Sequence, residues 1–107
     1  MMIDEPTIRR AVELVLEAAP EGSRVILFGS HARGQADSRS DLDLLVVEPA
    51  VGDRLAEMAR LDQVLCALRI PVDVVVMSQE RFDHWKDTPN TLAYRVSKEG
   101  KVYEQVA

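Results

Sequence analysis

The sequence lacks the features that would place a protein outside a reducing compartment. A single cysteine, Cys66, excludes an internal disulfide bond. No apolar run approaches the ~18 residues of a membrane-spanning helix, and the chain does not begin with the basic and then apolar stretch of a secretory signal. We therefore expect a cytoplasmic protein that does not contact the membrane.

The chain also has fewer basic than acidic residues. The chain has 13 Lys and Arg residues against 18 Asp and Glu residues, a formal net charge of −5. This balance disfavours direct binding to a nucleic-acid backbone, but it allows a nucleotide that is bound through metal ions. The 107 residues contain no repeat and no linker-like stretch. We expect one domain over residues 1–107, with no separate domain for a substrate.

Helical and strand patterns alternate along the chain. Apolar residues at helical spacing predict two long amphipathic helices, and short runs of β-branched and large apolar residues predict strands. The strands are predicted at 25–28, 42–47 and 72–77, and the helices at about 5–19, 51–69, 78–85 and 91–98, with a short helix or turn at 30–34. Cys66 is expected to be a small buried residue of the second long helix. The order of these elements predicts an α/β fold, a small sheet flanked by α-helices.

Three carboxylates stand in or beside apolar strands. Asp41 and Asp43 are two residues apart, so their side chains point to the same face of the strand, and Asp73 interrupts a run of valines. Unpaired carboxylates are costly to bury and repel one another. The strand ends could be exposed, a basic partner could lie there, or a divalent cation could bind. Because Asp43 and Asp73 both lie inside apolar runs, the shared metal site is favoured, and its ligands suit Mg²⁺.

A glycine-serine turn, Gly29-Ser30, follows the first predicted strand. Such a turn offers backbone N–H groups and a hydroxyl to a phosphate. If it meets the carboxylates, strand 25–28 must run antiparallel to strand 42–47, and strand 72–77 must run parallel to strand 42–47. A right-handed crossover through the helix at 51–69 would connect the parallel pair. One mixed sheet would then collect all five residues at one rim.

These residues together resemble a known signature. Gly29-Ser30, ten intervening residues and Asp41-Leu42-Asp43 are similar to the motif of the DNA polymerase β-type nucleotidyltransferase superfamily. Four specified residues at fixed offsets occur by chance on the order of once in a hundred thousand start positions at average composition. The match is therefore specific.

The resemblance extends over essentially the whole chain and is closest to the minimal nucleotidyltransferases (MNT). Arg33-Gly34, Ser40 and the third carboxylate, Asp73, fit the pattern of this small prokaryotic branch, as does the C-terminal stretch 92–104. His31 stands where the branch often has arginine, and its role stays open.

The resemblance implies a nucleotidyltransferase fold and a role in a type VII-like toxin–antitoxin pair. In such a pair the MNT protein is the antitoxin of a HEPN-domain toxin, with which it forms a hetero-oligomer. It transfers AMP from ATP to a tyrosine hydroxyl of the toxin.

The resemblance also implies roles for the carboxylates. Asp41 and Asp43 would bridge two Mg²⁺ ions. Asp73 would complete the site of the ion nearest the attacking hydroxyl and favour loss of its proton.

The phosphates of ATP would be bound on the other side of the motif. The Gly29 backbone and the Ser30 hydroxyl would hold the β- and γ-phosphates. Arg33 would neutralise phosphate charge, although a solvated turn arginine explains that residue equally well.

Two other functions remain open. The protein could neutralise a toxin by binding alone, since most of its surface is available for contacts. Nucleotidyl transfer to a small molecule or RNA is less favoured, because relatives with those acceptors add a domain for them. A phospho-acceptor receiver domain is disfavoured, because its acidic pair would follow the first strand, which here ends at Phe28-Gly29-Ser30.

Overall fold

A computed structural model describes residues 2–105. The single-domain prediction spans residues 1–107, of which Met1 and 106–107 lie outside the described residues. The elements follow the order α1 (Glu5–Ala18), β1 (Arg24–Phe28), α2 (Ser30–Arg33), β2 (Leu42–Glu48), α3 (Arg54–Leu65), the 3₁₀ helix η1 (Cys66–Leu68), β3 (Val72–Ser78), α4 (Gln79–Trp85), α5 (Leu92–Glu99) and β4 (Lys101–Glu104).

The strands form one mixed sheet with the order β3-β2-β1-β4. Strand β1 pairs antiparallel with β2, and β2 pairs parallel with β3. The α/β fold and both predicted strand directions are therefore confirmed. Strand β4 pairs antiparallel with β1 and was not predicted as a strand. It has only four residues and its Val102 is 52% exposed, so it carries too little apolar alternation to indicate a strand.

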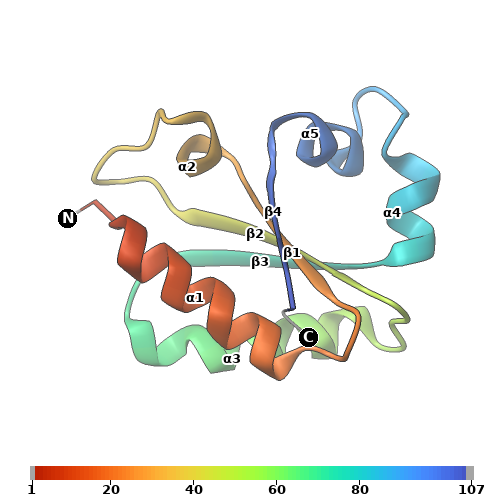
Figure 1. The fold of residues 1–107 in the computed structure, drawn as a ribbon, viewed down its shortest axis with the longest axis horizontal. Helices are drawn as coiled ribbons and strands as arrows, with labels where there is room; N and C mark the ends of the chain where they lie inside the picture. Colours follow the sequence, from red (N-terminus) through yellow and green to blue (C-terminus); the bar gives the residue numbers. More distant parts are fainter. Residues whose placement is uncertain (1, 106–107) are drawn as a thin grey trace.

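Helices cover both faces of the sheet (Figure 1). Helices α1 and α3 lie against one face, and α4 and α5 lie on the other. Side chains alternate along each strand, so each face carries its own apolar cluster. The first cluster includes Val25, Leu27, Leu44, Val46, Val74 and Val76 with residues of α1 and α3, and the second includes Ile26, Phe28, Leu45, Val47 and Met77 with Phe82 of α4 and Val96 of α5.

The helix starts agree with the capping residues of the sequence. Asp4, Ser78 and Thr91 accept hydrogen bonds from the backbone N–H groups three residues ahead, at 2.9, 3.1 and 3.2 Å, and so begin α1, α4 and α5. Gly100 caps the C-terminus of α5, where its backbone N–H donates a hydrogen bond to the Val96 carbonyl oxygen. No helix within residues 2–105 has the length and apolar character needed to cross a membrane.

The second long helix differs from its prediction. It ends at Leu65, and the chain then tightens into η1 before Arg69 adopts a left-handed conformation. The prediction that Cys66 is buried is wrong, because the side chain is exposed where this change of helix type occurs. In the sequence, apolar residues keep the α-helical spacing beyond Leu65. The pattern therefore does not reveal the change to a 3₁₀ helix that turns the Cys66 side chain outward.

A buried carboxyl group lies at the end of β2 that is remote from the predicted site. Glu48 is 2% exposed and lies beside Glu57 and Arg60 of α3. Arg60 donates two hydrogen bonds to the Glu57 carboxylate, at 2.7 and 2.8 Å. Burial, with the neighbouring Glu57 carboxylate, raises the pKa of Glu48 to about 8. The Arg60 and Glu48 hydrogen bonds lower the pKa of Glu57 to about 2, so the shared proton stays on Glu48.

This arrangement predicts a loss of stability as the pH rises from about 5 to 8. In that range the folded protein holds a proton on Glu48 that the unfolded chain has released. The free energy of unfolding therefore decreases with each unit by which the pH rises. The lowered pKa of Glu57 acts in a separate window, below pH 4.5. Glu48→Gln should abolish this part of the pH dependence, a difference of ~1 kcal/mol or more in the free energy of unfolding. Urea midpoints at pH 5.5 and 8.5 that fall equally in both proteins would contradict the assignment.

Candidate active site

The ends of three strands bring the predicted carboxylates to one rim of the sheet. Phe28, the last residue of β1, is the register partner of Asp43, and Asp43 is the register partner of Asp73 on the parallel strand β3. Neighbouring strands lie ~4.8 Å apart. Because Leu42 and Leu44 face α1 and α3, Asp43 faces the side covered by α5. Asp41, two residues earlier, extends towards the same side.

Gly29 fits between β1 and Asp43 because it has no side chain. Its backbone has φ 77° and ψ −158°, a conformation that only glycine adopts readily. A Cβ atom at this position would collide with the Asp43 carboxylate. Gly29 is the N-cap of the four-residue helix α2 (Ser30–Arg33), and Gly34 is its C-cap, in a left-handed conformation. The Gly-Ser turn therefore lies directly against Asp43.

The loop between α2 and β2 directs the chain into Asp41. Ser40 Oγ accepts a hydrogen bond from the Asp37 backbone N–H (2.9 Å), and Asp37 Oδ1 accepts one from the Arg39 backbone N–H (2.8 Å). His31 Nε2 lies 3.4 Å from the Ser40 carbonyl oxygen and links α2 to the residue that precedes Asp41. The His31 side chain thus lies at the edge of this loop, close enough to the carboxylates for its charge to act on Asp43.

Negative charge dominates the rim. Burial raises the pKa of Asp43, and the neighbouring Asp73 and Asp41 carboxylates raise it further, while Arg95 and His31 act in the opposite direction. The net increase means that the cationic side chains do not compensate the clustered carboxylates. Binding of a cation would stabilise the ionised form of Asp43.

The donor set fits Mg²⁺ in part. Among the residues that the structure describes, no three His, Cys, Asp or Glu side chains converge as a ready-made metal site. Mg²⁺ commonly binds through one or two carboxylates, and water and substrate phosphates supply its remaining ligands. Asp43 and Asp73, side by side on parallel strands, are suited to that mode of binding, with Asp41 adjacent.

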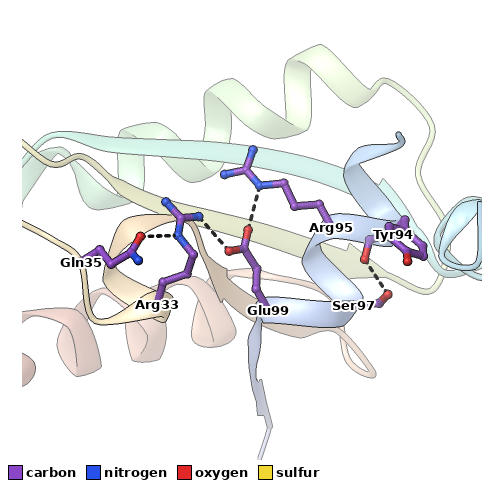
Figure 2. A network of polar contacts seen from close by, with 6 residues as sticks. All are labelled: Arg33, Gln35, Tyr94, Arg95, Ser97 and Glu99. Atoms are coloured by element: carbon purple, nitrogen blue, oxygen red, sulfur yellow. Dashed lines mark hydrogen bonds and ion pairs between the residues drawn. The ribbon is translucent and has the colours of Figure 1, made fainter. Parts of the chain in front are cut away.

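A polar network on α2 and α5 borders the rim (Figure 2). Glu99 accepts a hydrogen bond from Arg33 Nη1 at one carboxylate oxygen and from Arg95 Nε at the other, both at 2.8 Å. Partial burial works to raise the pKa of Glu99, but the two arginines outweigh it and lower the pKa. Arg33 is therefore ion-paired, not simply solvated. The sequence reading did not select Arg95 or Glu99, since their four-residue spacing on α5 is common to ordinary surface helices.

A sequence profile confirms the family. The profile of the nucleotidyltransferase domain family matches residues 8–102, which include the whole rim and α5. The chain belongs to this family. No curated protein matches the sequence significantly.

Solved structures support the same assignment for this nucleotidyltransferase. A protein assigned as a minimal nucleotidyltransferase is 34% identical, with a TM-score of 0.63 over 92% of this chain and 94% of that chain. This similarity confirms the resemblance to the minimal nucleotidyltransferases.

Two toxin–antitoxin complexes share the fold of this nucleotidyltransferase. A chain of one, solved with AMP-PNP, has a TM-score of 0.68 at 23% identity over 92% of this chain and 73% of that chain. A chain of the other, an MNT antitoxin with the tri-AMPylated HEPN toxin of Shewanella oneidensis, has a TM-score of 0.62 at 19% identity over 94% and 72%.

Proposed function

We propose that this nucleotidyltransferase transfers AMP from ATP to a tyrosine hydroxyl of a HEPN-domain toxin and so acts as its antitoxin. The observation that carries the proposal is the pairing of Asp43 with Asp73 at one rim of the sheet, two residues after Asp41 and directly against the Gly29-Ser30 turn. A toxin as the acceptor is supported by the structural neighbours, one of which contains a tri-AMPylated HEPN toxin.

The three carboxylates divide two roles in the proposed reaction. Asp41 and Asp43 would hold Mg²⁺ against the triphosphate, and Asp73 would lie on the side of the attacking hydroxyl. When bound, the ions supply positive charge to the phosphates and lower the pKa of the hydroxyl. Asp73 favours the ionised hydroxyl and accepts its proton directly or through water.

The proposed step is a displacement at the α-phosphorus of ATP. The tyrosine oxygen forms a bond to the α-phosphorus while the bond from that phosphorus to the bridging oxygen breaks. Pyrophosphate leaves with the bonding electron pair, and the AMP group remains on the tyrosine oxygen. Ser30 and the backbone of α2 would bind the departing phosphates.

Labelled ATP tests the proposal. The chain is incubated with Mg²⁺ and the HEPN-domain protein encoded beside it, with ATP labelled at either the α- or the γ-phosphorus. We expect the α-label to appear on the partner and the γ-label to be released, because only the AMP portion is transferred. Chelation of Mg²⁺, or replacement of the acceptor tyrosine by phenylalanine, should prevent labelling.

The contrary outcomes are equally distinct. Transfer of the γ-label would indicate phosphoryl transfer, and labelling that persists after chelation would contradict the metal requirement. Neutralisation of the toxin without any labelling would show that the protein acts by binding alone.

A further inference from the structure

Arg33 and Arg95 approach Glu99 from two helices. Arg33 belongs to α2 and Arg95 to α5, and each contributes one hydrogen bond to the Glu99 carboxylate (Figure 2). Glu99 thereby holds two guanidinium groups close together, although their residues are far apart in the sequence. One carboxylate balances only one of the two positive charges.

The Arg95 guanidinium lies next to the carboxylate rim. Its Cζ atom is 5.7 Å from the centre of the Phe28 ring, and Phe28 is the register partner of Asp43. The positive charge of Arg95 also partly offsets the rise in the pKa of Asp43 that burial and the neighbouring carboxylates cause. The aromatic ring therefore supports Arg95 at the edge of the site where the triphosphate would lie.

Both arginines keep donors available. A guanidinium has five N–H groups. Arg95 uses Nε for Glu99, and within residues 2–105 neither of its Nη atoms has a hydrogen-bond partner. Arg33 uses Nε for Gln35 and Nη1 for Glu99, which leaves its Nη2 without a partner in the same part of the chain. The two terminal nitrogens of Arg95 can donate a pair of hydrogen bonds to phosphate oxygens in the bidentate geometry that guanidinium groups favour.

The space beside Arg95 is large enough for a ligand. A groove of about 660 Å³ follows α5 on the side of Arg95 that is away from the carboxylate rim, and its lining residues are Asn90, Thr91, Leu92, Tyr94, Arg95, Lys98 and Glu99. Ligand pockets commonly have volumes of ~300–1,000 Å³. The Arg95 side chain is 54% exposed, so phosphate oxygens can reach it without rearrangement of the helix.

We propose that Arg95 and Arg33, held by Glu99, form a two-helix binding site for the polyphosphate part of the nucleotide. The inference rests on the proposed function, because it concerns the same site. Arg95 binds the phosphates beyond the α-phosphate and so selects a nucleoside triphosphate over a monophosphate. Glu99 orients the two arginines by their inner donors, Arg95 Nε and Arg33 Nη1, and leaves the outer donors for the ligand.

Calorimetric titration of the full chain with ATP and with AMP, in Mg²⁺, tests this inference. Arg95→Met should weaken ATP binding by about 10-fold or more, because a charge-assisted bidentate contact is lost, and should change AMP binding less than about 2-fold. Arg95→Lys, which keeps the charge but not the fork, should give an intermediate loss.

Arg10→Met is the matched control. Arg10 is 53% exposed and pairs with Glu13 on α1, across the sheet from Arg95, so its loss should leave the affinity for ATP unchanged. A urea midpoint for each variant monitors the fold.

The outcomes separate this inference from the proposed function. A wild-type chain that binds no ATP would overturn both. Wild-type binding of ATP with an unchanged affinity in Arg95→Met, or equal losses for ATP and AMP, would overturn the polyphosphate site alone.

Discussion

Replacement of Asp43 by asparagine should reduce the rate of nucleotidyl transfer by roughly three orders of magnitude or more. Asparagine has the same shape but no charge. In the proposed mechanism the variant therefore lacks one ligand for the ions that would stabilise the charge of the transition state. That stabilisation amounts to several kcal/mol, and each ~1.4 kcal/mol corresponds to a factor of ten in rate. The initial rate of AMP transfer to the partner measures the effect.

The stability of the same variant gives a second, independent result. The pKa of Asp43 is raised in the folded protein by burial and by Asp73 and Asp41, so its ionised form opposes folding at neutral pH in the absence of metal. Asp43→Asn should therefore unfold at an equal or higher urea concentration than the wild type. A rate within about tenfold of wild type, or a rate loss that merely follows a loss of stability, would contradict the role of Asp43.

Asp62→Asn is the control for the charge change. Asp62 is exposed on α3, which lies against the other face of the sheet. The substitution changes the net charge by the same amount and should leave the rate of transfer unchanged.

Replacement of Gly29 by alanine should have the second largest effect. The new Cβ atom would meet the Asp43 carboxylate, and the backbone of Gly29 has a positive φ of 77°. We expect a loss of ~1–3 kcal/mol in the free energy of unfolding and a reduction of about 100-fold or more in the rate, because Asp43 and Ser30 are displaced from one another.

Two other glycines separate the causes of this effect. Gly34 has a φ of 72° but open space where a Cβ would lie, so Gly34→Ala introduces backbone strain alone. Gly52 has open space and no positive φ, so its replacement introduces neither. Rates measured for the three variants should decrease most for Gly29, and equal rates for Gly29→Ala and Gly34→Ala would show that the contact with Asp43 is unimportant.

The sheet around the site could be predicted because each site residue lies within or directly beside a short segment that is itself recognisable as a strand. Asp41, Asp43 and Asp73 lie at the starts of predicted strands, and Gly29-Ser30 ends one. Only one set of strand directions brings them together, and that set is the one observed. The alternation of side chains then places Asp43 on the α5 side of the sheet. Local pattern and simple geometry were sufficient for this part.

The remaining features depend on contacts between distant segments. Arg33 and Glu99 are 66 residues apart, and their ion pair depends on the packing of α5 beside α2. Glu48 continues an apolar strand, and only the fold shows that Glu57 lies beside it. Cys66 follows the apolar spacing of α3, yet the change to a 3₁₀ helix exposes it. None of these arrangements is encoded by spacing within a single element.

The intact mass of the partner protein tests the central claim most directly. The HEPN-domain partner is purified after co-expression with the wild-type chain or with Asp43→Asn, and both preparations are measured. We predict that the wild-type chain adds one or more whole adenylyl groups to the partner and that Asp43→Asn adds none. An unmodified partner from the wild-type preparation, or the same added mass with Asp43→Asn, would contradict the account.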